Sequence, residues 1–149
     1  MIVGAGRKDE SRTTYDFGKT WTMTSNSPVF EGGDESKVVE LNNGSNLMSI
    51  RKSPNRLFSL SNDSGLTSSY AVPQTDILEP YCNGDIIRYT STKEGYNKDR
   101  LIHTIPYNTG GRKNLTIMIN YDEGNTWPVK KVIHANQAAY SSVTFSPID

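Results

Sequence analysis

Three aspartates lie in the same sequence context, and their carboxylates are groups that could do chemistry. In each copy a small polar residue precedes the Asp by two positions, Gly follows it by two and Thr by four, at 14–21, 61–68 and 120–127. Such an aspartate can accept hydrogen bonds from backbone N–H groups and from the Thr hydroxyl across a tight turn. The repeat therefore predicts turns, not catalysis, at Asp16, Asp63 and Asp122.

Glycine and tryptophan complete this repeat. Gly18, Gly65 and Gly124 follow the aspartates, where a turn needs a backbone conformation that other residues avoid. Trp21 and Trp127 end the first and third copies, and we expect each indole to close its hairpin as an apolar plug rather than to bind sugar. The second copy has Ser68 in that place, which predicts a looser turn.

The elements that must position these turns are short strands. Apolar runs are brief and are interrupted by Gly, Pro, Asn or Asp, which favours an antiparallel meander over helices. The aspartates are 47 and 59 residues apart, near the ~40–50 residues of one four-stranded blade in a β-propeller. We expect strands at 37–41, 47–52, 56–61, 85–90, 101–105, 115–121, 129–134 and 142–145.

Composition supports an all-β fold and excludes several function classes. The 149 residues are 34% hydrophobic and include 12 Gly and 7 Pro, a profile typical of short strands joined by many turns. Sixteen basic and sixteen acidic side chains cancel, so no overall field favours nucleic acid as a partner. The sequence contains neither the pattern of a signal peptide nor an apolar run of ~18 residues.

Cysteine and histidine give no sign of a metal or a disulfide framework. Cys82 is the single cysteine, so no internal disulfide or thiolate zinc site can form, and we expect it to be a small buried apolar residue. His103 and His134 are 31 residues apart and are interpreted as ordinary strand residues. We expect no metal site and no cofactor.

The repeat resembles the Asp box, or BNR repeat, of the exo-α-sialidase (neuraminidase) family, and further segments are similar to that family in the family's order. Glu35 precedes a Val-Glu-Leu strand, and the next strand ends in Arg51. A Pro-x-Cys-x-Gly loop follows at 80–84, then Arg112 before the third Asp box, then Ala-Tyr-Ser at 139–141. The resemblance extends from about Ser11 to the last residue.

This resemblance implies a six-bladed propeller, of which residues 1–149 would form about three blades' worth. We expect the end of one antiparallel four-stranded blade, two full blades and the start of a fourth, without the N-terminal blades and the C-terminal closing strands. The family's first substrate-binding Arg lies in an N-terminal Phe-Arg-Ile-Pro segment, and its general acid is an Asp in the blades that follow. Neither context occurs in this sequence.

The resemblance also implies roles for four residues. Tyr140 would be the nucleophile, Glu35 its general base, and Arg51 and Arg112 two of the three arginines that bind the substrate carboxylate. Sialic acid carries its carboxylate at the anomeric carbon, so a carboxylate nucleophile would meet like charge, and sialidases use a Tyr instead. A phenol of pKa ~10 needs a base to attack, and a guanidinium is permanently charged and bidentate toward a carboxylate.

Each role has a rival interpretation. Outside their motifs, the two arginines would be solvated strand ends and Tyr140 a packed aromatic residue. Glu40 competes with Glu35 for the role of base, but the two lie five positions apart and would face opposite sides of one regular strand. The neighbouring residues Lys130 and Lys131 are interpreted as a solvated face.

The resemblance therefore predicts an exo-α-sialidase that removes terminal α-linked sialic acids from glycoproteins, glycolipids or oligosaccharides with retention of configuration. Residues 1–149 alone are expected to be weak or inactive and to self-associate through open blade edges. The alternatives are a non-catalytic sialoglycan-binding module and a structural Asp-box propeller module. Relatives of this kind are typically secreted, attached to the cell surface or periplasmic.

Overall fold

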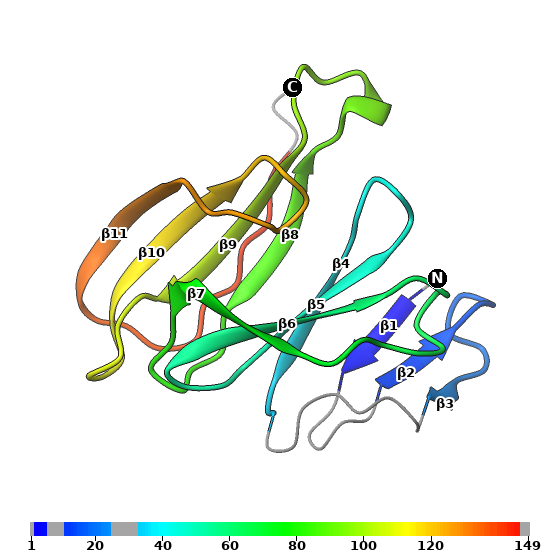
Figure 1. The fold of residues 1–149 in the computed structure, drawn as a ribbon, viewed down its shortest axis with the longest axis horizontal. Helices are drawn as coiled ribbons and strands as arrows, with labels where there is room; N and C mark the ends of the chain where they lie inside the picture. Colours follow the sequence, from blue (N-terminus) through cyan, green and yellow to red (C-terminus); the bar gives the residue numbers. More distant parts are fainter. Residues whose placement is uncertain (1, 6–10, 25–32, 147–149) are drawn as a thin grey trace.

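The structure is a computed structural model that describes residues 2–5, 11–24 and 33–146 (Figure 1). Eleven strands and one 3-10 helix make up its regular elements. They are β1 Ile2–Ala5, β2 Ser11–Thr14, β3 Thr22–Thr24, β4 Ser36–Glu40, β5 Asn46–Ile50, β6 Asn55–Ser61, β7 Val72–Leu78, β8 Asp85–Thr90, η1 Thr92–Glu94, β9 Arg100–Pro106, β10 Lys113–Asn120 and β11 Val129–Gln137.

The strands form three antiparallel sheets that follow one another along the chain. Sheet A has the order β1-β2-β3, sheet B the order β4-β5-β6-β7, and sheet C the order β8-β9-β10-β11. Strand β4 contacts both β1 and β8, so the three sheets lie side by side across Figure 1. The predicted all-β fold with antiparallel four-stranded sheets is confirmed.

Most of the expected strands are present, but their list was incomplete and one was wrong. Strands β1, β2 and β3 were missed because they are short. Strand β7 was missed because it is largely exposed, has three polar residues at its centre and has a Pro at its second position. The segment 142–145 is no strand. There the hydroxyl of Ser142 and the N–H of Val143 donate to the side-chain carboxylate of Asp85 in β8, at 3.1 and 2.9 Å, and not to the backbone of a neighbouring strand.

The three repeated segments form turns with the same hydrogen bonds. In each, one carboxylate oxygen of the Asp accepts the N–H of the Thr four residues on, at 2.8–2.9 Å, and the other accepts that Thr's hydroxyl. The side chain that begins the repeat binds both the Asp carboxylate and the N–H of the Gly. The glycines have φ between +85° and +98°, as their place in the turn predicted: Gly18, Gly65 and Gly124.

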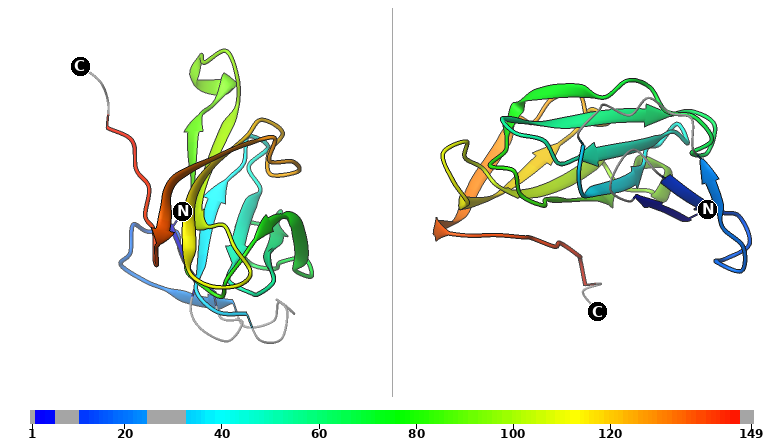
Figure 2. Two further views of the ribbon diagram at one scale, coloured as in Figure 1. Left: turned by 90° about the vertical axis from the view of Figure 1, so that its left-hand side faces the viewer. Right: turned by 90° about the horizontal axis from the view of Figure 1, so that it is seen from below.

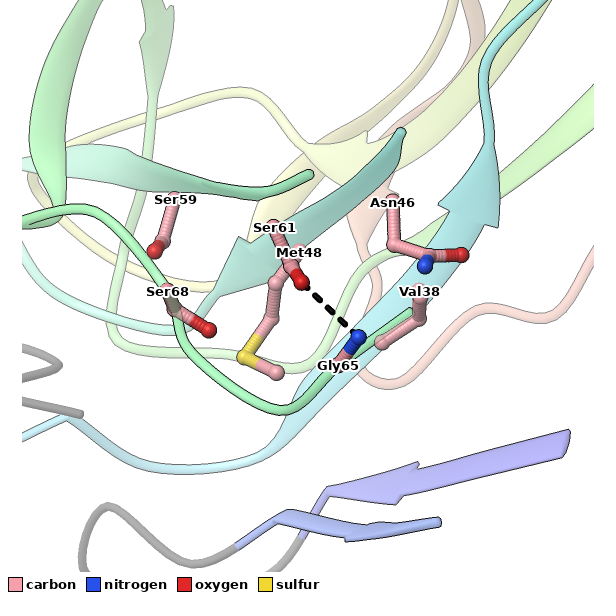
Figure 3. A pocket seen from close by; sticks show the side chains of 7 residues that line it. All are labelled: Val38, Asn46, Met48, Ser59, Ser61, Gly65 and Ser68. Carbon is pink, nitrogen blue, oxygen red and sulfur yellow. Dashed lines mark hydrogen bonds between the residues drawn. The ribbon is translucent and has the colours of Figure 1, made fainter. Parts of the chain in front are cut away.

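The second turn, 61–68, is as tight as the others, so the expectation of a looser turn was wrong. Ser61 accepts the N–H of Gly65 at 2.8 Å, the bond drawn in Figure 3. The turn lies across a small pocket from Val38 on β4 and Met48 on β5. The hydrogen bonds come from residues within the turn, so the absence of a Trp after Thr67 does not loosen them.

The two tryptophans differ in burial. Trp127 is only 1% exposed, and its ring meets those of Phe58 and His103 edge-on at 6.1 and 5.6 Å between centroids. Trp21 is 46% exposed, and its indole N–H donates to the Gly18 carbonyl at 3.2 Å. Trp127 is the buried plug that was predicted, whereas Trp21 covers only its own turn.

The main core lies between sheets B and C. Its buried members come from both sheets and from the third turn: Val39, Leu41, Leu47, Phe58, Ile77, Ile86, Leu101, Ile105, Met118 and Trp127. Each turn joins the last two strands of its sheet, so all three lie at the end of the sheets opposite to the start of β4 and the end of β5. We call the end of the sheets that carries the three turns the turn end. The opposite end, at the start of β4 and the end of β5, is called the site end.

After β11 the chain returns past the inner strands of sheet C (Figure 2). Ser141 donates to the Thr104 carbonyl in β9 at 3.0 Å, and the Phe145 ring meets that of Tyr89 in β8 at 6.2 Å. Tyr140 lies at the start of this returning segment. The segment thereby brings Tyr140 back toward sheet B.

Candidate active site

Glu35 and Arg51 are neighbours across the site end of sheet B. Glu35 directly precedes β4 and Arg51 directly follows β5, and the adjacent pair Ser36 and Ile50 is in register. The Arg51 N–H donates to the Glu35 carbonyl at 3.1 Å, and the Asp34 N–H donates to the Arg51 carbonyl at 3.2 Å. These two hydrogen bonds extend the pairing of β4 and β5 beyond Ser36 and Ile50. They thus place the side chains of Glu35 and Arg51 at the same end of sheet B.

Tyr140 reaches this pair from a distant part of the chain. Its hydroxyl donates to one oxygen of the Glu35 carboxylate, although the two residues are 105 positions apart. Nη1 of Arg51 donates to the other oxygen of Glu35 and, at 3.0 Å, to the Tyr140 hydroxyl. A phenol, a carboxylate and a guanidinium therefore contact one another in a closed triangle.

Burial and charge divide this triangle into a covered and an open part. Arg51 is 6% exposed, whereas Tyr140 is 56% exposed. Asp34 is also buried, and its carboxylate lies 3.8 Å from Nη1 of Arg51. The guanidinium thus forms the floor of the site between two carboxylates, and the phenol forms its solvent-facing side.

The hydrogen bonds set the protonation states within the triangle. Partial burial raises the pKa of Glu35, but the hydrogen bonds from Tyr140 and Arg51 outweigh it and hold that pKa below its usual value. The bond to Glu35 raises the pKa of Tyr140 above its usual value. At neutral pH the proton therefore rests on the phenol, and the carboxylate is ionised and ready to accept it.

Arg112 lies beside this triangle and not within it. It is exposed directly before β10, and its Nη2 donates to the carbonyl of Tyr81 at 2.9 Å. Its guanidinium carbon lies 5.7 Å from the centre of the Tyr140 ring. The structure thus brings all four sequence-predicted residues to one end of sheets B and C, with Arg112 at the margin.

Glu40, the rival candidate for the base, lies away from the triangle. Glu40 is exposed at the turn end of β4, opposite to the end at which Glu35 lies. Cys82 is fully buried, and burial raises the pKa of its thiol, as suits a small apolar residue. His103 is buried in β9, whereas Lys130 and Lys131 are exposed on β11.

A buried ion pair below the site was not predicted from the sequence. Arg56 and Glu79 have no exposed side-chain surface, and Nη1 of Arg56 donates to Glu79 at 3.0 Å. Arg56 also binds the hydroxyl of Ser49 at 2.9 Å, and that hydroxyl lies 3.0 Å from Nε2 of His103. The signal was available, because Arg56 directly precedes the apolar pair 57–58 in a strand and a charge there needs a partner.

The described part of the chain consists of the ranges 2–5, 11–24 and 33–146. Within them no group of three or more His, Cys, Asp or Glu side chains is placed to hold a metal ion. No helix in these ranges has the length and apolar character needed to cross a membrane.

Comparison with known proteins gives sialidases in both sequence and structure. No family model matches the chain. A sialidase of Micromonospora viridifaciens is 31% identical over 98% of this chain, and a sialidase of Bacteroides fragilis (strain YCH46) is 29% identical over 75% of it. The chain spans 23% and 21% of the lengths of these two relatives.

The solved structures agree with the sequence matches. The NanB sialidase of Streptococcus pneumoniae is similar with a TM-score of 0.80 and 26% identity, over 93% of this chain and 22% of that one. The Hadza microbial sialidase Hz136 gives 0.75 and 27%, over 86% and 25%. With its fold of antiparallel four-stranded sheets and these matches, the chain is a sialidase-family sequence.

Proposed function

We propose that this chain forms part of the catalytic centre of an exo-α-sialidase, in which Tyr140 is the nucleophile and Glu35 its general base. The observation that carries the proposal is the hydrogen bond from the Tyr140 hydroxyl to the Glu35 carboxylate. A nucleophile within hydrogen-bond reach of its base, with the base oriented by a third group, is the arrangement that covalent catalysis requires. Here Arg51 orients the base.

The proposed reaction has two displacements. The Tyr140 oxygen attacks the anomeric carbon, the bond from that carbon to the leaving oxygen breaks, and the phenolic proton passes to Glu35. The leaving oxygen takes up a proton from the solvent. Water then attacks the same carbon as the bond from that carbon to the Tyr140 oxygen breaks, Glu35 returns the proton to the phenolic oxygen, and the attacking water loses a proton to the solvent. This second inversion restores the original configuration. Arg51 stabilises both states, because its Nη1 bonds to the carboxylate and to the phenol oxygen.

The substrate class follows from the charge of the site. A terminal α-linked sialic acid on a glycoprotein, glycolipid or oligosaccharide has a carboxylate on its reacting carbon, and Arg51 and Arg112 are the cations beside Tyr140. Among the similar structures is an intramolecular trans-sialidase from Ruminococcus gnavus in complex with oseltamivir carboxylate, with 25% identity over 89% of this chain. We propose the same carboxylate class of ligand here.

A sialosyl fluoride with a second fluorine at C3 tests the nucleophile without a general acid, because fluoride leaves unprotonated. The C2–F bond breaks as the bond to the Tyr140 oxygen forms, and the C3 fluorine slows hydrolysis of the product. We expect residues 1–149 to gain one fluorosialosyl group on the peptide that contains Tyr140, detected by mass spectrometry. The Tyr140→Phe variant should gain none.

The outcomes separate the three hypotheses. An adduct on Tyr140 supports the enzyme, whereas binding of the sialic acid carboxylate in solution without an adduct would favour the sialoglycan-binding module. Neither binding nor adduct would favour the structural module. Turnover of unactivated sialosides should stay slow, since the family's general-acid context is not found in this sequence and that acid typically contributes ~10²–10⁴ in rate.

We also propose that residues 1–149 self-associate. Strand β11 is the last strand of sheet C, and its residues are exposed along its whole length, Val132 and Ile133 among them. An exposed edge strand offers unpaired backbone groups to another chain. Size-exclusion chromatography over a concentration series should show assemblies larger than 16.6 kDa, and a monomer at all concentrations would contradict this proposal.

A further inference from the structure

Tyr81 connects the two arginines of the candidate site. Its ring lies under the guanidinium of Arg51, with 4.2 Å between the guanidinium carbon and the ring centre. Its backbone carbonyl accepts a hydrogen bond from Nη2 of Arg112 at 2.9 Å. One residue thereby contacts Arg51 through its side chain and Arg112 through its main chain.

An unusual backbone conformation makes this double contact possible. Tyr81 has φ +58°, in the left-handed region that residues with a side chain seldom adopt. Such a conformation persists only where the surrounding structure holds it. Residues held in this way gather at binding and catalytic sites, which makes Tyr81 a candidate for a role beyond packing.

The buried carboxylate of Glu79 fixes the backbone next to Tyr81 by hydrogen bonds. One oxygen of its buried carboxylate accepts the N–H of Cys82 at 2.9 Å, and the other accepts the N–H of Lys52 at 3.2 Å and Nη1 of Arg56 at 3.0 Å. Lys52 directly follows Arg51, and Cys82 directly follows Tyr81. A single carboxylate thus ties the backbone beside Arg51 to the backbone beside Tyr81.

We propose that Tyr81 is a positioning residue that sets the placement of Arg51 and Arg112 relative to each other. Its ring prevents Arg51 from turning away from the site, and its carbonyl directs one edge of the Arg112 guanidinium. The proposal rests on the proposed function, since the arginines are assigned there to a substrate carboxylate. Because the Tyr81 ring is itself 45% exposed, we expect the loss of its contact with the Arg51 guanidinium to lower binding by a factor of about two to five.

The test compares Tyr81→Gly with Tyr81→Phe in the chain 1–149. Glycine accepts φ +58° but is not confined to it, so this variant loses the ring and frees the carbonyl. Phenylalanine keeps the ring and loses only the hydroxyl. Tyr96→Gly is the matched control, because Tyr96 is an exposed tyrosine in the hairpin between β8 and β9, which carries none of the site residues.

Two measurements are made on each variant. The first is the order of the Arg51 and Arg112 side chains without ligand, from ¹⁵N relaxation of their Nε–H groups, assigned with Arg51→Lys and Arg112→Lys. We expect Tyr81→Gly to lower the order of both arginines and Tyr81→Phe and Tyr96→Gly to leave it unchanged. The second is the affinity for the 2,3-didehydro analogue of sialic acid, which should fall two- to fivefold in Tyr81→Gly alone.

The two measurements separate this inference from the proposed function. If the unchanged chain does not bind the analogue, the proposed function fails, and the order of the arginines still decides the role of Tyr81. Arginine side chains as ordered in Tyr81→Gly as in the unchanged chain would overturn the inference. Equal losses of order in Tyr81→Gly and Tyr96→Gly would overturn it as well, since the effect would then be general.

Discussion

The two ends of the sheets are built by different rules. At the turn end, 14–21, 61–68 and 120–127 repeat one set of hydrogen bonds between residues at most four positions apart. At the site end nothing repeats, and the central hydrogen bond joins residues 105 positions apart. The turn end is specified locally, whereas the site end exists only after sheets B and C have packed.

This difference indicates how stability and chemistry are divided. Each turn can form from its own eight residues, and the third also contributes the buried Trp127 to the core between the sheets. The site end places an exposed phenol over a buried guanidinium, next to a buried ion pair. Substitutions at the turn end should therefore change the free energy of unfolding, and those on the exposed part of the site end should change reactivity.

The largest expected effect comes from the two tryptophans, which occupy the same position in their turns. Trp127→Ala should lower the free energy of unfolding by about 3–5 kcal/mol, because it leaves a cavity in the core. Trp21→Ala should lower it by less than about 1 kcal/mol, because Trp21 is half exposed. Urea denaturation followed by circular dichroism measures both.

Equal losses from these two tryptophan variants would contradict the comparison. They would mean that the indole contributes to the free energy of unfolding through its own hydrogen-bonded turn and not through its packing in the core.

Glycines in the same two turns give the next test. A Cβ on Gly124 would lie 2.8 Å from Cδ2 of Leu47, whereas on Gly18 its nearest neighbour would be Trp21 at 3.9 Å. Both have positive φ, so both Ala variants suffer backbone strain of about 1 kcal/mol. Gly124→Ala should lose about 2–4 kcal/mol in total, because overpacking adds ~1–3 kcal/mol.

The Gly18→Ala variant is the control for strain alone. A loss in Gly124→Ala no greater than in Gly18→Ala would show that Leu47 moves aside at no cost, and that the third turn is not packed more tightly than the first.

The turn end was the part of the fold that the sequence made predictable. Its hydrogen bonds follow from residue types at fixed spacing, so Asp16, Asp63 and Asp122 could be assigned to turns without knowing the fold. The burial of Trp21 could not, because it depends on which sheet lies beside the first turn. The segment 142–145 has strand-like residues, but the Asp85 carboxylate binds its backbone, and no local pattern shows that contact.

The site end was predictable only through family resemblance. The family motifs predicted four site residues, which are Glu35, Arg51, Arg112 and Tyr140. The structure brings these side chains to one end of the sheets. No spacing rule could show that Arg51 contacts Glu35 and Tyr140 with one nitrogen atom. Tyr81 and Glu79 were missed because their roles depend on a left-handed backbone and on burial, which the sequence does not display.

Acid should weaken the turn end over a defined range of pH. Hydrogen bonds from Thr20, first through its N–H, lower the pKa of Asp16 to about 2, and those from Thr67, first through its hydroxyl, lower the pKa of Asp63 to about 2. Because the ordinary value is 3.8, the stability from these carboxylates is complete above about pH 4 and is lost as the pH falls toward 2.

The measurement is the free energy of unfolding from pH 5 to pH 2, in the unchanged chain and in Asp63→Asn. We expect a shallower dependence on pH in the variant, since one of the titrating groups is gone. Curves with the same slope would show that the Asp63 carboxylate does not couple folding to protonation.

The smallest expected effect on stability is at the centre of the proposed chemistry. Tyr140→Phe removes one hydroxyl from a side chain that is 56% exposed, so the free energy of unfolding should change by no more than about 0.5 kcal/mol. The same change removes a hydrogen bond that lowers the pKa of Glu35, so that pKa should rise toward its ordinary value of 4.5. Titration of the Glu35 carboxyl carbon by NMR measures the rise, with Tyr89→Phe as the control, because Tyr89 is a similarly exposed tyrosine that packs against Phe145.

A rise in the pKa of Glu35 in Tyr140→Phe alone, at unchanged stability, would show that this end of the sheets tunes protonation without supporting the fold. A large loss of stability with an unchanged pKa would reverse the division between the two ends, because Tyr140 would then support the fold and leave the protonation of Glu35 unaffected.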